Sequence, residues 1–260
     1  AVGYGLAKRG VKTCLVDAVP TFSRASRANM GLIWCQSKAL GCPQFVRWGF
    51  ASSRAYGKLA AELKELSGID TGYAPTGGII PCLGEAELEA RAQFIEKLRA
   101  ETEDGTYPAS VLSRKELEGM LPKVPFGPEV SGGIWSDMDG YVDPLHLMFA
   151  FRKSFVRLGG TLFAGERVSE VKPSGKGYAV VCGGRTLECG KAVLAAGLGV
   201  RKLAAQLGTD IPVFPNKSQV MLLERIPADV LPIPLLGIAR TFGGTVMIGA
   251  AHENMGMDRR

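Results

Sequence analysis

Asp17 is the residue whose type and position most clearly suggest chemistry. It ends an apolar, β-rich stretch, residues 11–16, and that stretch follows a short helical pattern, residues 2–9, which Gly10 closes. A helix, a strand and an acid in this order form the second half of a Rossmann βαβ unit, in which the acid accepts hydrogen bonds from the ribose of a dinucleotide. A solvated loop acid is the simpler alternative, but the helix–Gly–strand context favours ribose binding.

The first half of that unit, a strand with a G-x-G-x-x-G turn, is not found in the sequence. The acid follows this turn by about 20 residues, so the last glycine of the turn would fall near residue 1. The first residue is Ala rather than Met. We therefore expect residues 1–260 to be a fragment of a longer protein and to be inactive alone.

Two stretches of small residues could bring the backbone close to the same cofactor. "KAVLAAGLG" predicts a strand that ends at residues 195–197 and opens into a helix. In "ASRANMG", Ser26 and Asn29 could bond to a pyrophosphate or a flavin, and Gly31 could permit a close approach. A tight strand–helix turn and a loop with polar caps are the alternatives, and neither stretch identifies a cofactor by itself.

The composition is that of an ordinary globular protein. Hydrophobic residues make up 46% of the chain and charged residues 22%, and no apolar run of about 18 residues occurs. The net charge is +6, but the basic residues are scattered, which argues against a nucleic-acid partner. Six cysteines without a C-x-x-C pair and only two histidines argue against a metal site. Cys14, in an apolar strand, is expected to be buried, and free thiols fit a cytoplasmic location.

Helical and strand-like patterns alternate along the chain and predict a mixed α/β (α+β) protein. Helices are predicted over residues 45–66, 84–101 and 143–158. The last has Asp143 as its N-cap and Pro144 in its first turn, and apolar residues on two faces predict packing on both sides. Ser113 and Glu116 form a capping box. "TGYAPTGGIIPCL" predicts a strand pair with a Gly-Gly bend.

The alternation of these patterns divides the chain into two interleaved parts. A nucleotide-binding domain is predicted over residues 1–70 and 137–205, where helices and strands alternate. A substrate domain is predicted over residues 71–136 and 206–260, where antiparallel β patterns surround one long helix. We thus expect a Rossmann-like domain that is interrupted by an antiparallel β-sheet domain with helices.

Several segments, in this order and spacing, resemble the FAD-dependent amino-acid oxidase (DAO) family. They are "YGLAKRGVKTCLVDA", "ASRANMGLIW", "TGGIIPCL", "LSRKELEGMLP", "DMDGYVDPLHLMFAF", "GERVSEV", "AVLAAGLGV", "FPNKSQVMLLER" and "GTVMIGAAHENMG". The resemblance runs across essentially the whole chain. Within the family it is similar to bacterial D-amino-acid dehydrogenases, glycine and sarcosine oxidases, and the flavin subunits of opine oxidase and hydrogen cyanide synthase.

The resemblance implies FAD as the cofactor and hydride transfer from the CH–NH carbon of an amino acid or secondary amine to flavin N5. Contacts with FAD are then expected at Asp17, Ser26, Arg27, Asn29, Gly31, Leu32, Val168, Ala195, Ala196 and Gly197. Arg240 is a candidate partner for the substrate carboxylate and His252 a candidate for facing the substrate. A surface arginine and a loop histidine are the simpler interpretations, and His146, inside a helix, is expected to be structural.

Two features depart from the family pattern. Lys217, Ser218 and Gln219 stand where the family commonly has a basic residue, Gly and Gln. The chain also stops at Arg260, before the family's C-terminal segment that closes over the flavin. The resemblance therefore predicts that both ends of the flavin site are missing.

Two other classes of function stay open. An NAD(P)-dependent dehydrogenase would share the helix–strand–acid pattern, although the interrupted domain plan and "ASRANMG" argue against it. The second is a non-catalytic subunit that holds FAD within a multi-subunit complex. The expected partner is a small amine substrate. Association with a partner subunit or with the inner face of the cytoplasmic membrane would serve electron transfer.

Overall fold

The computed structural model describes residues 1–18, 25–38, 40–102, 105–249 and 253. It divides into two compact units, which are described separately. The first contains residues 1–27, 151–219 and 251–260, and the second contains residues 28–150 and 220–250. These bounds differ from the predicted domains, since residues 28–70 and 137–150 fall in the second unit and residues 206–219 and 251–260 in the first. Compactness does not decide which ligand a unit binds, so the division by function stays a prediction.

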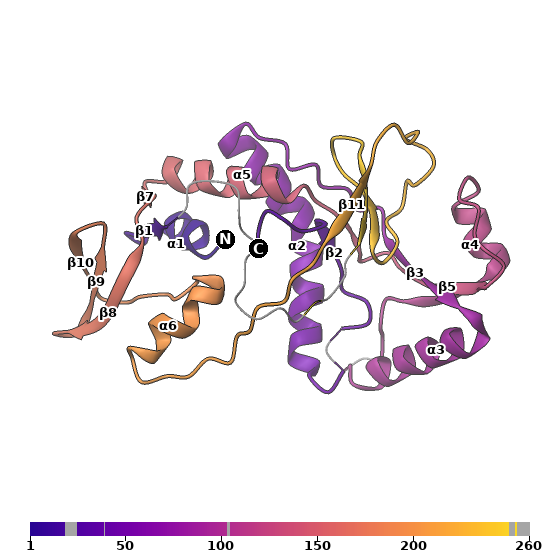
Figure 1. The fold of residues 1–260 in the computed structure, drawn as a ribbon, viewed down its shortest axis with the longest axis horizontal. Coiled ribbons are helices and arrows are strands. Elements are labelled where there is room, and N and C mark those ends of the chain that lie inside the picture. The colour runs from indigo at the N-terminus through magenta and orange to yellow at the C-terminus, as the bar shows by residue number, and fades with distance from the viewer. Residues whose placement is uncertain (19–24, 39, 103–104, 250–252, 254–260) are drawn as a thin grey trace. The chain divides into compact units, whose positions relative to one another are not determined.

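The first unit is built on two parallel strands beside a short helix (Figure 1). Helix α1 (Val2–Lys8) ends before Gly10, whose φ of 73° requires the left-handed region, and the chain continues into β1 (Cys14–Asp17). β1 pairs in parallel with β7 (Thr161–Ala164). Tyr4 packs edge-to-face on Phe151 of α5 (Pro144–Arg157), with ring centroids 5.4 Å apart. The predicted helix, glycine and acid-ended strand are therefore confirmed.

A three-stranded antiparallel sheet completes the strands of the first unit. It has the order β10-β9-β8 and consists of β8 (Val168–Ser174), β9 (Gly177–Cys182) and β10 (Arg185–Cys189). Helix α6 (Val200–Ala205) lies against β8. Just beyond that helix, Gln206 Oε1 accepts a hydrogen bond from the N–H of Val171 at 2.9 Å, and Gln206 Nε2 donates to the carbonyl of Ser169 at 3.0 Å. The side chain of Gln206 therefore ties the end of α6 to an edge of this sheet.

The predicted strand before residues 195–197 is wrong for the described chain. Residues 191–196 form neither helix nor strand, and Gly197–Gly199 is a 3₁₀ turn that leads into α6. A strand exists only where a neighbour satisfies its backbone groups. Among the described residues β1 pairs with β7 alone, so residues 191–196 have no such neighbour there. Cys14 is exposed rather than buried in this two-stranded sheet.

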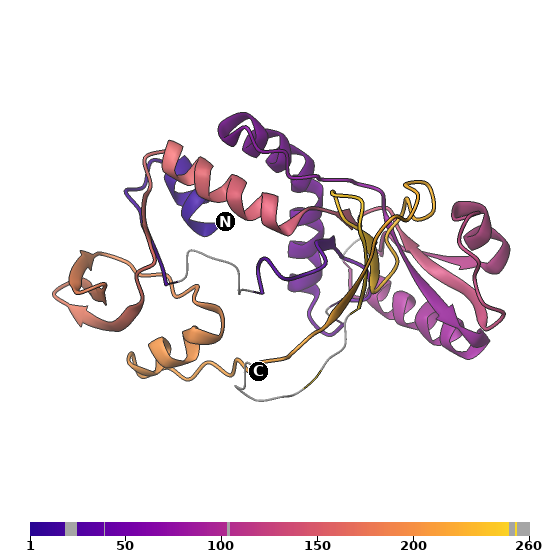
Figure 2. The same cartoon turned by 45° about the horizontal axis from the view of Figure 1, so that its top comes forward.

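The second unit is organised around antiparallel strands (Figure 2). One group has the order β3-β5-β4, with β3 (Gly78–Leu83), β4 (Ser110–Ser113) and β5 (Val130–Ser136). Another has the order β11-β13-β12, with β11 (Val220–Leu223), β12 (Ile238–Arg240) and β13 (Val246–Gly249). Leu235 links the two groups, because it bridges to Ile79 in parallel and to Ile238 in antiparallel fashion.

Both faces of the β3-β5-β4 group are covered, because neighbouring residues of a strand point to opposite sides. Ile80, Cys82 and Ile134 pack with residues of α2 (Pro43–Ser67) and α3 (Gly84–Ala100). Ile79, on the other face, packs with residues of α4 (Arg114–Met120) and with Leu231, Leu235 and Val246. The sheet is therefore the middle layer of this unit.

The helices of the sequence are confirmed with small shifts at their ends. The predicted N-cap of α5 is present, since Asp143 Oδ1 accepts from the N–H of His146 at 2.8 Å, and the capping box of α4 is present. The Gly-Gly bend is wrong: Gly78 begins β3, which pairs with β5 rather than with its own neighbour in sequence. α5 is not covered on both sides, because Phe149 and Val156 remain 39% and 50% exposed.

Candidate functional site

In the first unit, Asp17 lies where the sequence predicts it. It is the last residue of β1, half-buried, and its backbone carbonyl accepts from the N–H of Gly165 at 2.7 Å. Ligands of open α/β sheets bind beyond the carboxyl ends of parallel strands. The carboxylate at the end of β1 therefore fits the role of a ribose acceptor.

The other predicted FAD residues of the first unit are mostly accessible. Ser26, Ala195, Ala196 and Gly197 are exposed, and a Cβ added at Gly197 would meet nothing within 4 Å. Arg27 and Val168, the first residue of β8, are half-buried. Small residues with open space around them fit a backbone that a cofactor could approach.

In the second unit, the structure itself requires glycine at position 31, without any ligand. Its φ is 70°, and a Cβ there would lie 2.0 Å from the carbonyl oxygen of Val142. Asn29 Oδ1 accepts from the N–H of Gly31 at 2.9 Å, so this side chain caps the turn. The next two residues form β2 (Leu32–Ile33), which pairs with β6 (Gly140–Tyr141). The close contact of Gly31 is thus with its own chain.

A group of polar residues that the sequence did not single out lies next to β2. The carboxylate of Asp139, which is 2% exposed, accepts from the backbone N–H groups of Cys35 and Gln36 and from Nε2 of Gln36. Burial raises the pKa of Asp139 to about 6, against the lowering effect of these donors. Nothing in "SDMDGYV" distinguishes this buried acid from its exposed neighbour Asp137.

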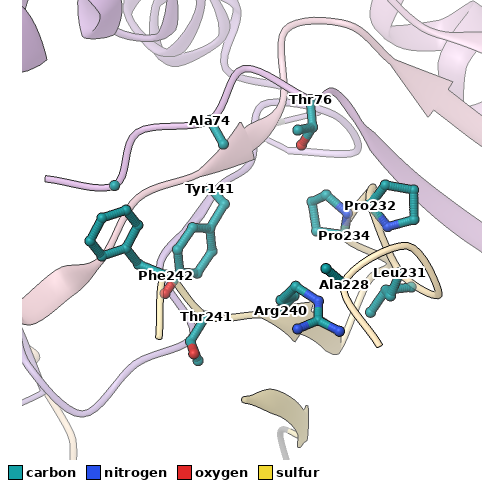
Figure 3. A pocket seen from close by; sticks show the side chains of 11 residues that line it. Ala74, Thr76, Tyr141, Ala228, Leu231, Pro232, Pro234, Arg240, Thr241 and Phe242 are labelled. Carbon is teal, nitrogen blue, oxygen red and sulfur yellow. The ribbon is translucent and has the colours of Figure 1, made fainter. Parts of the chain in front are cut away.

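Arg240 lines a pocket of about 320 Å³ in the second unit (Figure 3). The other lining residues come from the segment after α2, from β6 and from the loops around β12: Gly72, Ala74, Thr76, Tyr141, Ala228, Leu231, Pro232, Pro234, Thr241 and Phe242. Most of this lining is apolar. The volume falls in the range of small-molecule sites.

The guanidinium of Arg240 is largely committed to backbone carbonyls. Nη1 donates to Gly244 at 2.7 Å, and Nη2 donates to Ile226 at 2.5 Å and to Pro227. Nε is buried and makes no hydrogen bond within the described part of the chain, and the same holds for Oη of Tyr141. Burial raises the pKa of Tyr141 to about 12. Both hydrogens of Nη2 and one hydrogen of Nη1 are thus used, and the two N–H groups that remain are the buried Nε–H and the second hydrogen of Nη1.

Of the two histidines of the chain, the structure describes only His146. His252 lies outside the described residues. His146 Nδ1 is 2.9 Å from the carbonyl oxygen of Asp70, and its ring packs edge-to-face on Phe242 with centroids 5.5 Å apart. These contacts give His146 a packing role, as expected.

Metal centres and membrane-spanning helices do not occur among the described residues. In the part of the chain that the structure covers, no group of three or more His, Cys, Asp or Glu residues could hold a metal ion. The helices of that part are too short or too polar to cross a membrane.

Comparison with solved structures defines the class of protein. The fold is a mixed α/β fold with antiparallel sheets, and it matches glycine oxidase from Geobacillus kaustophilus with a TM-score of 0.89. The match has 25% sequence identity and covers 100% of this chain and 70% of that chain. Residues 1–260 match the family described as FAD dependent oxidoreductase, DAO, and the chain belongs to that family.

Relatives in sequence include proteins named as subunits of larger enzymes. An opine oxidase subunit of Agrobacterium tumefaciens is 33% identical over 254 residues, which are 97% of this chain and 67% of that protein. The hydrogen cyanide synthase subunit HcnC of Pseudomonas protegens is 26% identical over 309 residues, covering 98% of this chain and 69% of that protein. The chain thus spans about two thirds of the length of these relatives.

Proposed function

We propose that this protein oxidises the CH–NH bond of an amino acid or a secondary amine with FAD as the cofactor. The observation that carries the proposal is the similarity to the opine oxidase subunit of Agrobacterium tumefaciens, which extends over 97% of this chain. Glycine oxidase of Geobacillus kaustophilus, which is similar over 100% of the chain, supports an amino acid as the substrate. D-amino acids, glycine, sarcosine and opines are the candidates within it.

The residues of the first unit fit the adenosine side of FAD. Asp17, at the carboxyl end of a parallel strand, is suited to accept hydrogen bonds from ribose hydroxyls. Ala195, Ala196 and Gly197 are small and exposed, so their backbone is open to a ligand. FAD, when bound, supplies the hydride acceptor. The protein would have to orient the α-carbon and neutralise the carboxylate of the substrate.

Arg240 stays our proposed partner for that carboxylate, but with a different hydrogen-bond geometry from the one expected. Its Nε–H has no hydrogen-bond acceptor in the described chain, whereas its Nη groups bind the carbonyls of residues 226, 227 and 244. Because Nη2 has no hydrogen left, Arg240 would give a carboxylate single charged hydrogen bonds, from the second hydrogen of Nη1 or from Nε–H if the ligand reaches that buried atom, and not the parallel pair expected of a free guanidinium. Arg240→Lys should therefore raise KM more than it lowers kcat.

The names of the relatives support an association with a second protein. The opine oxidase relative and HcnC are each named as one subunit of an oxidase or a synthase. We propose that this protein likewise works together with another chain. Co-purification of a tagged protein with a defined second chain from its own host would support this, and an active isolated protein would contradict it.

The decisive test of the cofactor is a titration of FAD into the intact protein, wild type and Asp17→Ala. The loss of one or two charge-assisted hydrogen bonds should weaken binding roughly 10- to 100-fold. Asp210→Ala is the matched control, because Asp210 is an exposed acid of the same unit. Equal affinities for wild type and Asp17→Ala would contradict the assignment of Asp17.

A second measurement separates an enzyme from a subunit that only holds FAD. Amine is added without oxygen to the FAD-bound protein, and the flavin absorbance is followed. Bleaching by D-amino acids, glycine, sarcosine or opines would identify the substrate. FAD binding without bleaching by any of them would favour the non-catalytic alternative, and binding of NAD(P) instead of FAD would favour the dehydrogenase alternative.

A further inference from the structure

Asp139 lies in the turn between β5 and β6 and reaches a segment a hundred residues earlier in the chain. The N–H of Cys35 donates to Oδ1 at 2.5 Å, and the N–H of Gln36 is 3.4 Å from the same oxygen. Gln36 Nε2 donates to Oδ2 at 2.7 Å. One buried carboxylate therefore holds two consecutive backbone amides and one side chain.

The same segment is packed against the beginning of β3. Gln36 Nε2 also donates to the carbonyl of Gly78 at 2.9 Å. A Cβ added at Gly78 would lie 2.6 Å from the ring of Trp34 and 2.9 Å from Cβ of Asp139. Tyr107 Oη donates to the carbonyl of Cys35 at 3.2 Å. Residues 34–36 thus lie in a tight position between three parts of the second unit.

The strand pairing before this segment is short. β2 and β6 pair at two positions, Leu32 with Tyr141 and Ile33 with Gly140, and the N–H of Val142 donates to the carbonyl of Gly31. Two residue pairs are a weak ladder by themselves. Asp139 directly precedes β6 in sequence, so its hydrogen bonds extend this pairing at the end where the segment leaves it.

We propose that Asp139 is a positioning residue whose ionised carboxylate anchors residues 35 and 36 and thereby fixes Gly31 and Leu32. The assignment of Gly31 and Leu32 to FAD rests on the proposed function above. The anchoring of the segment does not rest on it.

The ionisation of Asp139 makes this anchor sensitive to pH. The titratable groups that act on it are the thiol of Cys35, the amine of Lys38 and the hydroxyl of Tyr107. Burial raises the pKa of Cys35 to about 11 and that of Tyr107 to about 12, so both are neutral from pH 5 to 8. Lys38 is exposed and lowers the pKa of Asp139. Asp139 is therefore the group of this set that changes charge near pH 6.

Amide hydrogen exchange of Cys35 and Gln36 tests the proposal. Asp139→Ala removes every acceptor, so exchange of these two amides should accelerate at least tenfold at pH 7.5. Asp139→Asn keeps the shape and one acceptor, and Gln36 Oε1, which has no partner in the described structure, can turn to meet the new amide. Asp139→Asn should therefore accelerate exchange of the two amides less than Asp139→Ala does. Asp137→Ala, an exposed acid in the same turn, should change exchange less than twofold.

The wild-type protein alone provides a second measurement, which needs no variant to fold. The Cys35 and Gln36 amides exchange by a local opening in which Asp139 stays buried, and a protonated carboxyl group accepts their hydrogen bonds more weakly than a carboxylate. Their protection, corrected for intrinsic exchange, should therefore fall as the pH is lowered through about 6, whereas global unfolding, which brings Asp139 into water, has the opposite pH dependence. Asp139→Asn should lack this midpoint. Unchanged amides in Asp139→Ala, or a midpoint that persists in Asp139→Asn, would overturn the proposal.

A titration of FAD separates this proposal from the proposed function. If Asp139→Ala loosens residues 35 and 36 and weakens FAD binding several-fold, both are supported. If it loosens them and the affinity for FAD stays that of the wild type, the anchor stands and the assignment of Gly31 and Leu32 to FAD fails. If the amides do not change, the anchor fails whatever FAD does.

Discussion

At the scale of single residues, Asp139 links the stability of the fold to pH. Its pKa is raised from 3.8 to about 6 in the folded protein, so the folded state holds this proton more tightly than the unfolded state. The contribution to stability is therefore complete below about pH 3.8 and is lost as the pH rises through 6. At ~1.36 kcal/mol per pKa unit, this corresponds to about 3 kcal/mol at most.

Asp139→Asn should remove this dependence. Urea unfolding followed by circular dichroism between pH 4 and 7 should show a free energy of unfolding that falls less steeply with pH in the variant than in the wild type. Asp137→Asn provides the comparison, because Asp137 is exposed and should leave the slope unchanged. Parallel pH profiles for wild type and Asp139→Asn would show that the buried carboxyl group does not titrate in this range.

Residues were predictable from the sequence where their role is local. Asp17 ends a strand formed by the residues just before it, and Asp143 caps the helix that begins just after it, so the adjacent sequence predicts both. Asp139 and Asp137 stand two residues apart in one turn, yet one is buried and the other exposed. A segment a hundred residues earlier decides which one is buried, and no local pattern contains that information.

At the scale of elements, a glycine inside α2 and the glycine that caps its C-terminal end should respond in opposite directions to the same substitution. Gly49 is inside the helix with nothing within 4 Å of an added Cβ, so Gly49→Ala should stabilise the protein by about 0.5–1 kcal/mol. Gly68 ends the helix at a φ of 72°, where Ala is strained, so Gly68→Ala should destabilise it by about 1–2 kcal/mol. Equal signs in urea unfolding would mean that α2 does not end at Gly68.

The capping box of α4 gives a second prediction at this scale. Ser113 Oγ accepts from the N–H of Glu116, and Oε2 of Glu116 accepts from the N–H of Ser113 at 2.7 Å. Ser113→Ala should cost about 1 kcal/mol of unfolding free energy. Ser110→Ala, at an exposed position of the same strand, should cost much less. Similar losses for the two variants would mean that the box contributes little to stability.

Helices and strands were predictable from the sequence when their backbone hydrogen bonds form within the same segment of the chain. α2, α3 and α5 satisfy their own N–H and C=O groups, and periodicity with Gly68 and Pro144 as boundaries located them. Strands depend on partners. Residues 191–196 carry a strand-like sequence without a partner in the described structure, and β3 pairs with β5 instead of turning at Gly77 and Gly78.

At the scale of the whole molecule, β11 is an apolar edge. Among the described residues it pairs with β13 alone, and Val220, Met221 and Leu222 are 46–62% exposed. An exposed apolar edge strand is a template for association between chains. Met221→Lys should therefore lower the apparent mass at high protein concentration in light scattering. Gln219→Lys adds the same charge just outside the strand, and an equal effect of that control would assign the change to net charge.

The positions of the three tryptophan side chains determine which part of the molecule tryptophan fluorescence can follow during unfolding. Every tryptophan of the chain, Trp34, Trp48 and Trp135, belongs to the second unit. The rings of Trp34 and Trp135 press on the backbone at Gly78 and Gly77, while Trp48 is 70% exposed. Indole emission therefore follows the melting of the second unit only. The unit that carries Asp17 contains no tryptophan, so a melting curve followed by tryptophan fluorescence reports on one of the two units and not on the other.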